Sequence, residues 1–226
     1  MIKTNKTKLE LWVKVNSLLQ SILIVLSIYY KSIFIYMLVI IILHCYLFLF
    51  DLNNKQRLLP NSVTLLRLCH IPMLFLFKFD LSIITTVIVS FLILDGLDGL
   101  IAKKLNVASK FGEFFDKECD ASFVSFVTLL ISIETTLYYL AIIGLLRYVF
   151  VLVSYLIKKI KKLRELPDHS SQFNRISFVL FLACIIVGCY FHQYVWANLI
   201  WNVGFLIMLL SYLLSFVFIL SKQYDY

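Results

Sequence analysis

Long, continuous apolar runs dominate this sequence and restrict what the chain can fold into. Hydrophobic residues make up 62% of its 226 residues, above the share of about 45–50% found in soluble domains. In lipid a backbone must satisfy its own hydrogen bonds, so the choice lies between helices and a closed barrel. The runs do not alternate with polar residues, which favours helices. The sequence therefore predicts an all-α, polytopic transmembrane helical bundle.

Eight apolar segments are candidates for membrane spans, and the first is the weakest of them. It is short, because a bilayer crossing needs about 20 residues, and it contains Ser17, Gln20 and Ser21. An interfacial or re-entrant helix is the alternative for this segment. No small-residue cleavage site follows it, so we interpret it as retained rather than as a signal peptide. The predicted segments are 17–30, 32–50, 62–78, 82–98, 119–133, 136–157, 176–191 and 196–220.

The distribution of basic residues predicts how these segments are oriented. With a cytoplasmic N-terminus and eight spans, the cytoplasmic segments hold 17 of the 21 Lys and Arg residues. This pattern places both termini and the turn after the fourth span on the cytoplasmic side. Anionic lipids of the cytoplasmic leaflet then explain the net charge of +8, with 158–175 as a leaflet-binding loop, and no nucleic-acid partner is needed. Size and the lack of a targeting signal suggest a bacterial inner membrane.

Acidic residues gather in one stretch of this apolar chain, residues 94–123. The stretch contains six of the 13 Asp and Glu residues. Asp95 and Asp98 are three residues apart, and Asp116 and Asp120 are four apart. Each pair therefore shares one face of a helix. Acidic side chains at a membrane edge are costly, and such residues are functional by default.

The segment 103–110, between the two acidic pairs, is a predicted polar turn at the cytoplasmic surface. Ser109 is placed to cap the helix that follows it. A connection this short makes the two flanking helices antiparallel neighbours. The four carboxylates can then converge on one spot near the membrane surface.

Four clustered carboxylates repel one another and require a compensating cation. The cluster lacks Cys and His ligands, which favours a hard ion that prefers oxygen: Mg²⁺, Mn²⁺ or Ca²⁺. Two ions about 4 Å apart would suit four carboxylates and a displacement at phosphorus. The alternative is a solvated charged hairpin whose acids pair with neighbouring lysines. Glycines one turn from the acids, on the same helix faces, argue for the metal site.

The spacing of these residues resembles the signature of the CDP-alcohol phosphotransferase family. That signature reads DxxDGxxAR and, after eight or nine residues, GxxxDxxxD. In this chain it runs from Asp95 to Lys103 and from Gly112 to Asp120, with Lys103 where the family has Arg. LPNSVTLLRL at 59–68 is similar to the PNxxTxxR opening of the family's first core helix.

The resemblance implies a domain organisation and an activity. A six-helix core would occupy 60–226, after an N-terminal extension at 1–59 with one or two hydrophobic helices. The implied activity is a membrane transferase that moves a phosphatidyl group from CDP-diacylglycerol to a small hydroxylated acceptor, with release of CMP, in phospholipid biosynthesis. Membership in this family also suggests a homodimer.

Three alternatives to this activity stay open. One is the reverse pairing, a CDP-alcohol donor with diacylglycerol as acceptor. Another is a divalent-ion-binding membrane transporter without enzymatic activity, although the acids lie at one membrane edge rather than along a midplane path. The last is an inactive family member, for which Lys103 is the only hint. Lys keeps the charge of the family's Arg but loses its planar fork.

By the same resemblance, individual residues receive roles. Asp95, Asp98, Asp116 and Asp120 would bind two Mg²⁺ or Mn²⁺ ions, and Asp120 would also take the proton from the acceptor hydroxyl. Gly99 and Gly112 would let cytidine and pyrophosphate lie against bare backbone. The full set of expected nucleotide contacts is Asn61, Thr64, Gly99, Ala102, Lys103 and Gly112. Asn61, Thr64 and Arg67 are spaced by three residues and line one helix face, which would contact the nucleotide or its phosphates. In the alternative interpretation of 59–68, Asn61 caps a helix and Arg67 snorkels.

Arg147 is a candidate acceptor-binding residue by its position alone. It lies near the middle of the predicted span 136–157, where a charge is expensive and needs a partner. It would hold an anionic group of the acceptor or pair with an acid of the metal site. The alternative is a snorkelling side chain or a structural ion pair.

Overall fold

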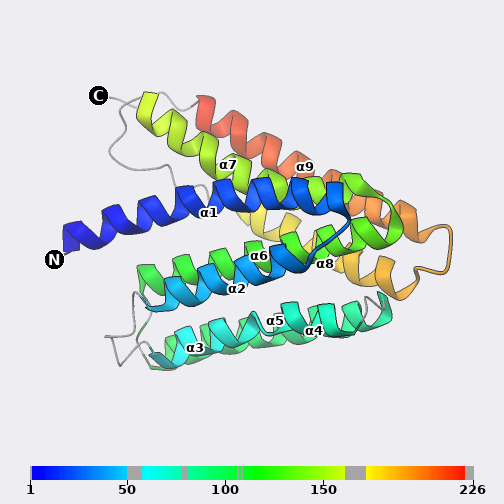
Figure 1. Ribbon diagram of the computed structural model, residues 1–226, viewed down its shortest axis with the longest axis horizontal. Helices are drawn as coiled ribbons and strands as arrows, with labels where there is room; N and C mark the ends of the chain where they lie inside the picture. The colour runs from blue at the N-terminus through cyan, green and yellow to red at the C-terminus, as the bar shows by residue number, and fades with distance from the viewer. Residues whose placement is uncertain are drawn as a thin grey trace. The chain divides into compact units, whose positions relative to one another are not determined.

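The computed structural model describes residues 2–49, 58–77, 81–105, 107, 109–160 and 172–221. Within these ranges the ordered elements are helices, and no strand occurs (Figure 1). The chain forms two compact units: a terminal unit, Met1–Leu26 with Tyr139–Tyr226, and a central unit, Ser27–Tyr138. The predicted all-α fold class is confirmed.

Apolar helices of spanning length confirm that the protein is polytopic. Five helices in the described residues are long and apolar enough to cross a membrane, and two shorter apolar helices, Phe34–Leu49 and Ile176–Tyr190, accompany them. Each corresponds to a segment predicted from the apolar runs. The five are Leu9–Tyr30, Leu59–Leu76, Ile83–Ile101, Tyr138–Ile160 and Ala197–Leu220.

The first helix is longer than its apolar run suggested. α1 spans Ile2–Tyr30, and its apolar part, Leu9–Tyr30, has 22 residues, which is enough for a bilayer crossing. Of the polar side chains that weakened the prediction, Ser17 and Gln20 are buried, with exposures of 1% and 0%, and Ser21 is half-buried. Gln20 Nε2 donates a hydrogen bond to Asn16 Oδ1 at 3.2 Å. A polar stripe buried in protein does not stop the rest of a helix from facing lipid.

The central unit is built around α6. α3 packs against both α5 and α6, and α2 packs against α6. Residues 122–132 of α6 are buried on all faces. The hydroxyls of Ser125, Thr128 and Ser132 donate to carbonyls four residues earlier, so these buried polar groups are satisfied within the helix. The helices of this unit are α2 (Phe34–Leu49), α3 (Leu58–Arg67), α4 (His70–Leu76), α5 (Leu81–Lys104) and α6 (Lys110–Thr135).

The apolar stretch Leu59–Leu76, counted above as one candidate span, contains a short break that divides the predicted span 62–78 into α3 and α4. Pro72 explains the break, because it has no N–H for the carbonyl of Leu68 and its ring crowds that carbonyl. The break comes directly after Arg67, the last residue of α3. On the far side His70 Nδ1 donates to the Arg67 carbonyl oxygen at 2.8 Å. The backbone of Arg67 is therefore held in place although the helix ends there.

The turn between α5 and α6 agrees with the sequence prediction. α5 ends at Lys104 and α6 begins at Lys110, and the two helices run antiparallel (Figure 1). Ser109 is extended, with φ −143° and ψ 152°, and its Oγ accepts from the N–H of Gly112 at 3.0 Å. Ser109 is thus confirmed as the cap of α6, the helix that carries Asp116 and Asp120.

Residues from the predicted N-terminal extension pack directly on α6. His44 Nδ1 donates to the Ile40 carbonyl at 2.8 Å, which leaves Nε2 to accept from Ser122 Oγ at 3.2 Å. Tyr36 stacks with Phe126 at a centroid distance of 6.4 Å. α2 therefore supports the helix of the predicted site. The division into an extension at 1–59 and a core at 60–226 stays a prediction.

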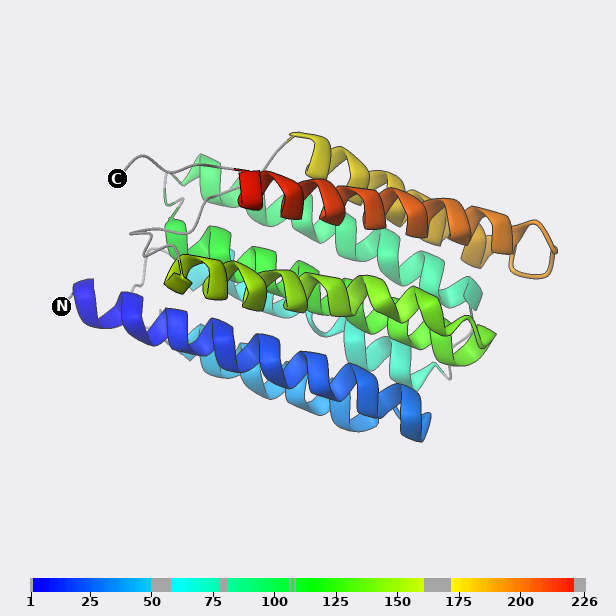
Figure 2. The same ribbon diagram turned by 90° about the horizontal axis from the view of Figure 1, so that it is seen from above.

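In the terminal unit, α8 (Gln172–Tyr190) and α9 (Ala197–Ser221) form a close helical hairpin (Figure 2). A Cβ added at Gly188 would lie 2.1 Å from Trp201 Nε1, and one added at Gly204 would lie 2.8 Å from Cys184 Cβ. Small residues at a helix interface allow this approach. The same unit contains α7 (Ala141–Ile160), whose Lys158 pairs with Glu10 of α1 at 2.9 Å.

Candidate active site

Three aspartates from two helices converge in the central unit. One carboxylate oxygen each of Asp95 on α5 and of Asp116 and Asp120 on α6 lies within 4.8 Å of the other two. Their side chains are half-buried, with exposures of 40%, 34% and 24%. These are three of the four predicted metal ligands. Asp98 belongs to α5, but its side chain lies outside the described part of the structure.

The guanidinium of Arg67 lies among the three carboxylates. Its Nη2 pairs with Asp95 Oδ1 at 2.8 Å and also with Asp120 Oδ1, while Nη1 pairs with Asp116 Oδ1. The Arg67 side chain is completely buried. Its Cζ lies 4.5 Å from the centroid of the Phe91 ring, a distance typical of a cation–π contact. The guanidinium is therefore held between an aromatic face and three acids.

Sequence reasoning did not find this arrangement of Arg67. It placed the residue on a nucleotide-facing surface or had it snorkel, whereas the side chain pairs with the acids. A signal was present, because acids at a membrane edge need a cation. Of the Lys and Arg residues, only Arg67 and Arg147 lie within the predicted spans away from the span ends. The sequence could not choose between these two, since the choice depends on which helices pack together.

Aromatic rings pack beside the carboxylates and the Arg67 guanidinium. Phe91 of α5 and Phe123 of α6 stack with centroids 3.7 Å apart and an interplanar angle of 5°. His70 stands edge-on to both rings and its Nε2 lies 2.9 Å from Ser90 Oγ. Apolar rings beside the charges lower the local dielectric and strengthen the electrostatic interactions among them.

The other described acids of the stretch are directed elsewhere. Glu113 is exposed and pairs with Lys117 at 2.7 Å, which is the solvated pairing considered as an alternative for the whole stretch. Glu118 is exposed by only 3% and lies one turn before Ser122, on the side of α6 that faces α2. The acids of α6 are thus divided among three faces of that helix, and the face with Asp116 and Asp120 contributes to the site.

The predicted nucleotide-binding residues occupy different environments. Asn61 and Thr64 are each exposed by 5%, and a Cβ added at Gly112 would lie 3.4 Å from Asn61 Oδ1 and 3.2 Å from Ser109 Oγ. Gly112 therefore allows α3 to approach α6. Gly99 is exposed, with nothing within 4 Å of an added Cβ. The side chains of Ala102 and Lys103 lie outside the described residues, and all six nucleotide-binding roles stay predictions.

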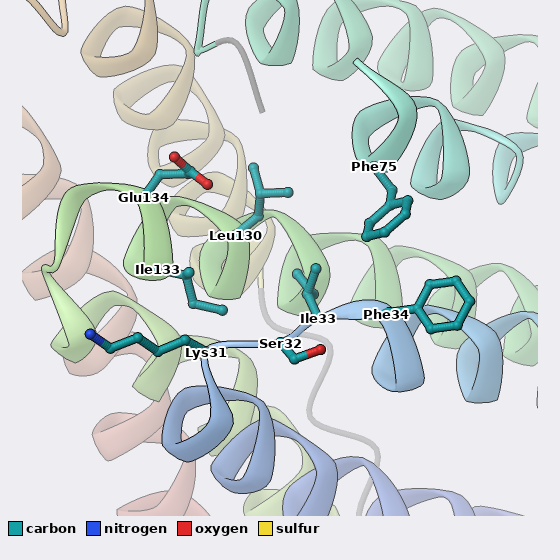
Figure 3. A pocket seen from close by; sticks show the side chains of 8 residues that line it. All are labelled: Lys31, Ser32, Ile33, Phe34, Phe75, Leu130, Ile133 and Glu134. Carbon is teal, nitrogen blue, oxygen red and sulfur yellow. The ribbon is translucent and has the colours of Figure 1, made fainter. Parts of the chain in front are cut away.

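A predicted site residue, Arg147, and a cavity of the central unit are two further features of the described residues. Arg147 lies on α7 of the terminal unit, and its acceptor-binding role stays a prediction. A cavity of about 220 Å³ lies in the central unit between the α1–α2 turn, α4 and the end of α6 (Figure 3). It is lined by Glu134, which follows Asp120 by 14 residues, or about 21 Å along the helix. The cavity is therefore distant from the carboxylate cluster.

The apolar helices and the carboxylate cluster describe a helical membrane protein with a group of acidic side chains in its central unit. The sequence model for CDP-alcohol phosphatidyltransferases matches residues 57–217, which is more than half of the chain. The protein therefore belongs to the CDP-alcohol phosphatidyltransferase family. It is a membrane transferase of phospholipid synthesis that acts on CDP-alcohol substrates and alcohol acceptors. No curated protein and no solved structure matches the chain significantly.

The family generally uses a divalent metal, and the cluster fits one. Three half-buried carboxylates face one point, and a cation already occupies that point in the form of the Arg67 guanidinium. Among these four groups, two formal negative charges remain. Oxygen ligands with this charge suit Mg²⁺ or Mn²⁺.

Proposed function

We propose that the protein transfers the phosphatidyl group of CDP-diacylglycerol to a small hydroxylated acceptor and releases CMP. The convergence of Asp95, Asp116 and Asp120 within 4.8 Å, in a chain of this family, carries the proposal. The cluster lies toward the ends of two antiparallel apolar helices. At this position the lipid tail of the donor would lie in the membrane, and its water-soluble nucleotide would face the aqueous phase.

The proposed reaction is a displacement at phosphorus. The acceptor hydroxyl oxygen forms a bond to the phosphatidyl phosphorus, and the bond from that phosphorus to the CMP oxygen breaks. Asp120 takes the acceptor proton, a contribution of about 10²–10⁴-fold in rate. Together with Asp98, the three clustered aspartates would hold two Mg²⁺ or Mn²⁺ ions, and these ions would neutralise the charge of the diphosphate and of the leaving CMP phosphate.

The remaining predicted residues keep the binding roles expected from the sequence in this proposal. Asn61, Thr64, Ala102 and Lys103 contact the nucleotide or its phosphates, and Arg147 holds an anionic group of the acceptor. The positive-inside pattern supports a cytoplasmic site, family membership supports a homodimer, and the proposed location is a bacterial inner membrane.

CMP release from the purified protein tests the proposed function. We expect release when the protein in nanodiscs receives CDP-diacylglycerol, Mg²⁺ or Mn²⁺ and one member of a panel of small alcohols. Chelation of the metal should abolish release, and added Mg²⁺ or Mn²⁺ should restore it. Release only from a CDP-alcohol with diacylglycerol would favour the reversed donor and acceptor. Ion flux without CMP release would favour a transporter.

Gly99 offers a test of donor binding that does not disturb the fold. Gly99→Leu places a side chain where the protein leaves open space, so we expect an unchanged or slightly higher melting temperature, because Gly is the poorer helix former by up to about 1 kcal/mol. If the donor lies against this backbone, its KM should rise by about tenfold or more. The measurement is the donor KM together with thermal unfolding.

Gly96→Leu is the matched control for this test. Gly96 lies one turn earlier on α5, is exposed and also has nothing within 4 Å of an added Cβ. Gly96 does not belong to the family signature, so the donor KM of the Gly96→Leu variant should stay within about twofold of the wild-type value. Equal effects of both variants on KM would remove Gly99 from the nucleotide site.

A further inference from the structure

Arg67 combines two properties that rarely occur together in a membrane helix. It is completely buried, and it contacts three separate carboxylates, one from α5 and two from α6. A buried charge persists only where pairing and hydrogen bonds compensate for the lost water. The three acids provide that compensation for the arginine, and the arginine provides it for them.

The guanidinium occupies the position in which a metal would bind. Its Nη atoms lie against Oδ1 of Asp95, Asp116 and Asp120, and the same three residues bring carboxylate oxygens within 4.8 Å of one another. A divalent ion bound by these carboxylates would need to approach the same oxygens. The guanidinium and a divalent ion cannot both bind these oxygens fully. Each oxygen that coordinates the ion weakens its hydrogen bond to the guanidinium, and each hydrogen bond weakens the coordination of the ion.

We propose that Arg67 is a positioning residue that acts as a counter-cation for the metal-free site and competes with the metal. Without metal, the guanidinium holds the three aspartates together against their mutual repulsion. Metal entry requires the guanidinium to give up part of these contacts. The inference rests on the proposed function in one respect, since it takes the incoming cation to be the metal of the transferase.

The backbone of Arg67 is held by contacts that do not involve the three carboxylates. Its carbonyl accepts from His70 Nδ1 at 2.8 Å, and His70 in turn contacts Ser90 of α5, so the backbone is tied to two helices. The Phe91 face, 4.5 Å from Cζ, gives the cation a favourable contact that does not depend on the carboxylates. Metal binding should therefore weaken the Arg67–Asp pairs without shifting α3.

Mn²⁺ binding to the purified full-length protein in detergent micelles tests this inference. Free Mn²⁺ is followed by electron paramagnetic resonance, and thermal unfolding is recorded with and without saturating Mn²⁺. We expect Arg67→Met to bind Mn²⁺ about tenfold tighter or more than wild type, a difference typical of lost charge-assisted hydrogen bonds. Its melting temperature should fall without metal and recover most of the loss with Mn²⁺.

Lys117→Met is the matched control, because it removes a positive charge next to Asp116 that pairs with Glu113 instead of the cluster. Its Mn²⁺ affinity should change by less than about threefold, as expected for an exposed pair. Arg67→Lys retains the charge without the planar fork. It should shift affinity and stability in the same directions as Arg67→Met, by smaller amounts, and it provides the test if Arg67→Met does not fold.

Several outcomes would overturn the inference. Unchanged or weaker Mn²⁺ binding in folded Arg67 variants would show that the arginine does not compete with metal. A stability loss of equal size with and without Mn²⁺ would show a purely structural role. A wild-type protein that binds no Mn²⁺ but releases CMP would refute this inference and leave the transferase in place, whereas absence of CMP release under every condition would refute the proposed function itself.

Discussion

Asp120→Asn should lower the rate of CMP release by about 10²–10⁴-fold, the contribution of a general base. Asparagine has the shape of aspartate but cannot accept the proton of the acceptor hydroxyl. The change also removes one of the three acids paired with buried Arg67, which should cost about 1–3 kcal/mol of stability. The measurement is the rate of CMP release at saturating substrates and metal, with thermal unfolding to show that the variant is folded.

Substitutions at two other positions on α6 distinguish the loss of a general base from the loss of a metal ligand. Asp116→Asn removes another acid of the cluster, so raising the Mn²⁺ concentration should restore part of the activity of this variant. The same increase should restore little activity to Asp120→Asn, because added metal does not replace the base. Glu113→Gln is the control, because Glu113 is exposed and pairs with Lys117. Its rate should stay close to that of wild type. If Asp120→Asn retains activity within a few-fold of wild type, Asp120 is not the base.

Gly188→Leu should strongly destabilise the hairpin of α8 and α9. The Trp201 indole, exposed by 2%, lies against the Gly188 backbone, and even a Cβ there would be 2.1 Å from Nε1 and 2.4 Å from Cδ1. The rigid indole must leave its site, and losing a buried Trp costs about 3–5 kcal/mol. We expect a clear fall in the thermal unfolding midpoint in detergent.

The neighbouring residue and the contacting indole provide the controls for Gly188. Val187→Leu places a similar side chain on α8 at an exposed position and should leave the midpoint nearly unchanged. Because Gly188 and Trp201 are in contact, their substitutions should not be additive. Adding Trp201→Ala to Gly188→Leu should therefore cost much less than Trp201→Ala alone. Additive losses, or a wild-type midpoint for Gly188→Leu, would contradict the proposed packing.

Local sequence signals predicted the helices well because a helix depends on neighbours in the chain. The apolar run at 196–220 corresponds to α9, and the polar turn at 103–110 with its Ser109 cap separates α5 from α6. The break between α3 and α4 was missed although Pro72 indicates it. A proline within an otherwise continuous apolar run can kink, break or begin a helix, and tertiary contacts decide among these outcomes.

The sequence predicted the acidic residues of the site, but it did not predict that Arg67 pairs with them. Spacings of three and four residues placed Asp116 and Asp120 on one helix face, and the structure brings that face together with Asp95. Spacing alone did not show that Glu113 faces outward or that Glu118 faces α2. It also did not place α3 against both α5 and α6, which is what brings Arg67 to the acids.

By itself, the sequence determined that this protein is helical, lies in a membrane and concentrates negative charge at the end of one helical hairpin, because hydropathy and helical periodicity are properties of adjacent residues. The tertiary structure alone decided which carboxylates meet, which turn away, and that an arginine from a third helix holds them together. The physical reason is that the balance of a buried charge depends on groups that are distant in the chain and become neighbours only when the helices pack.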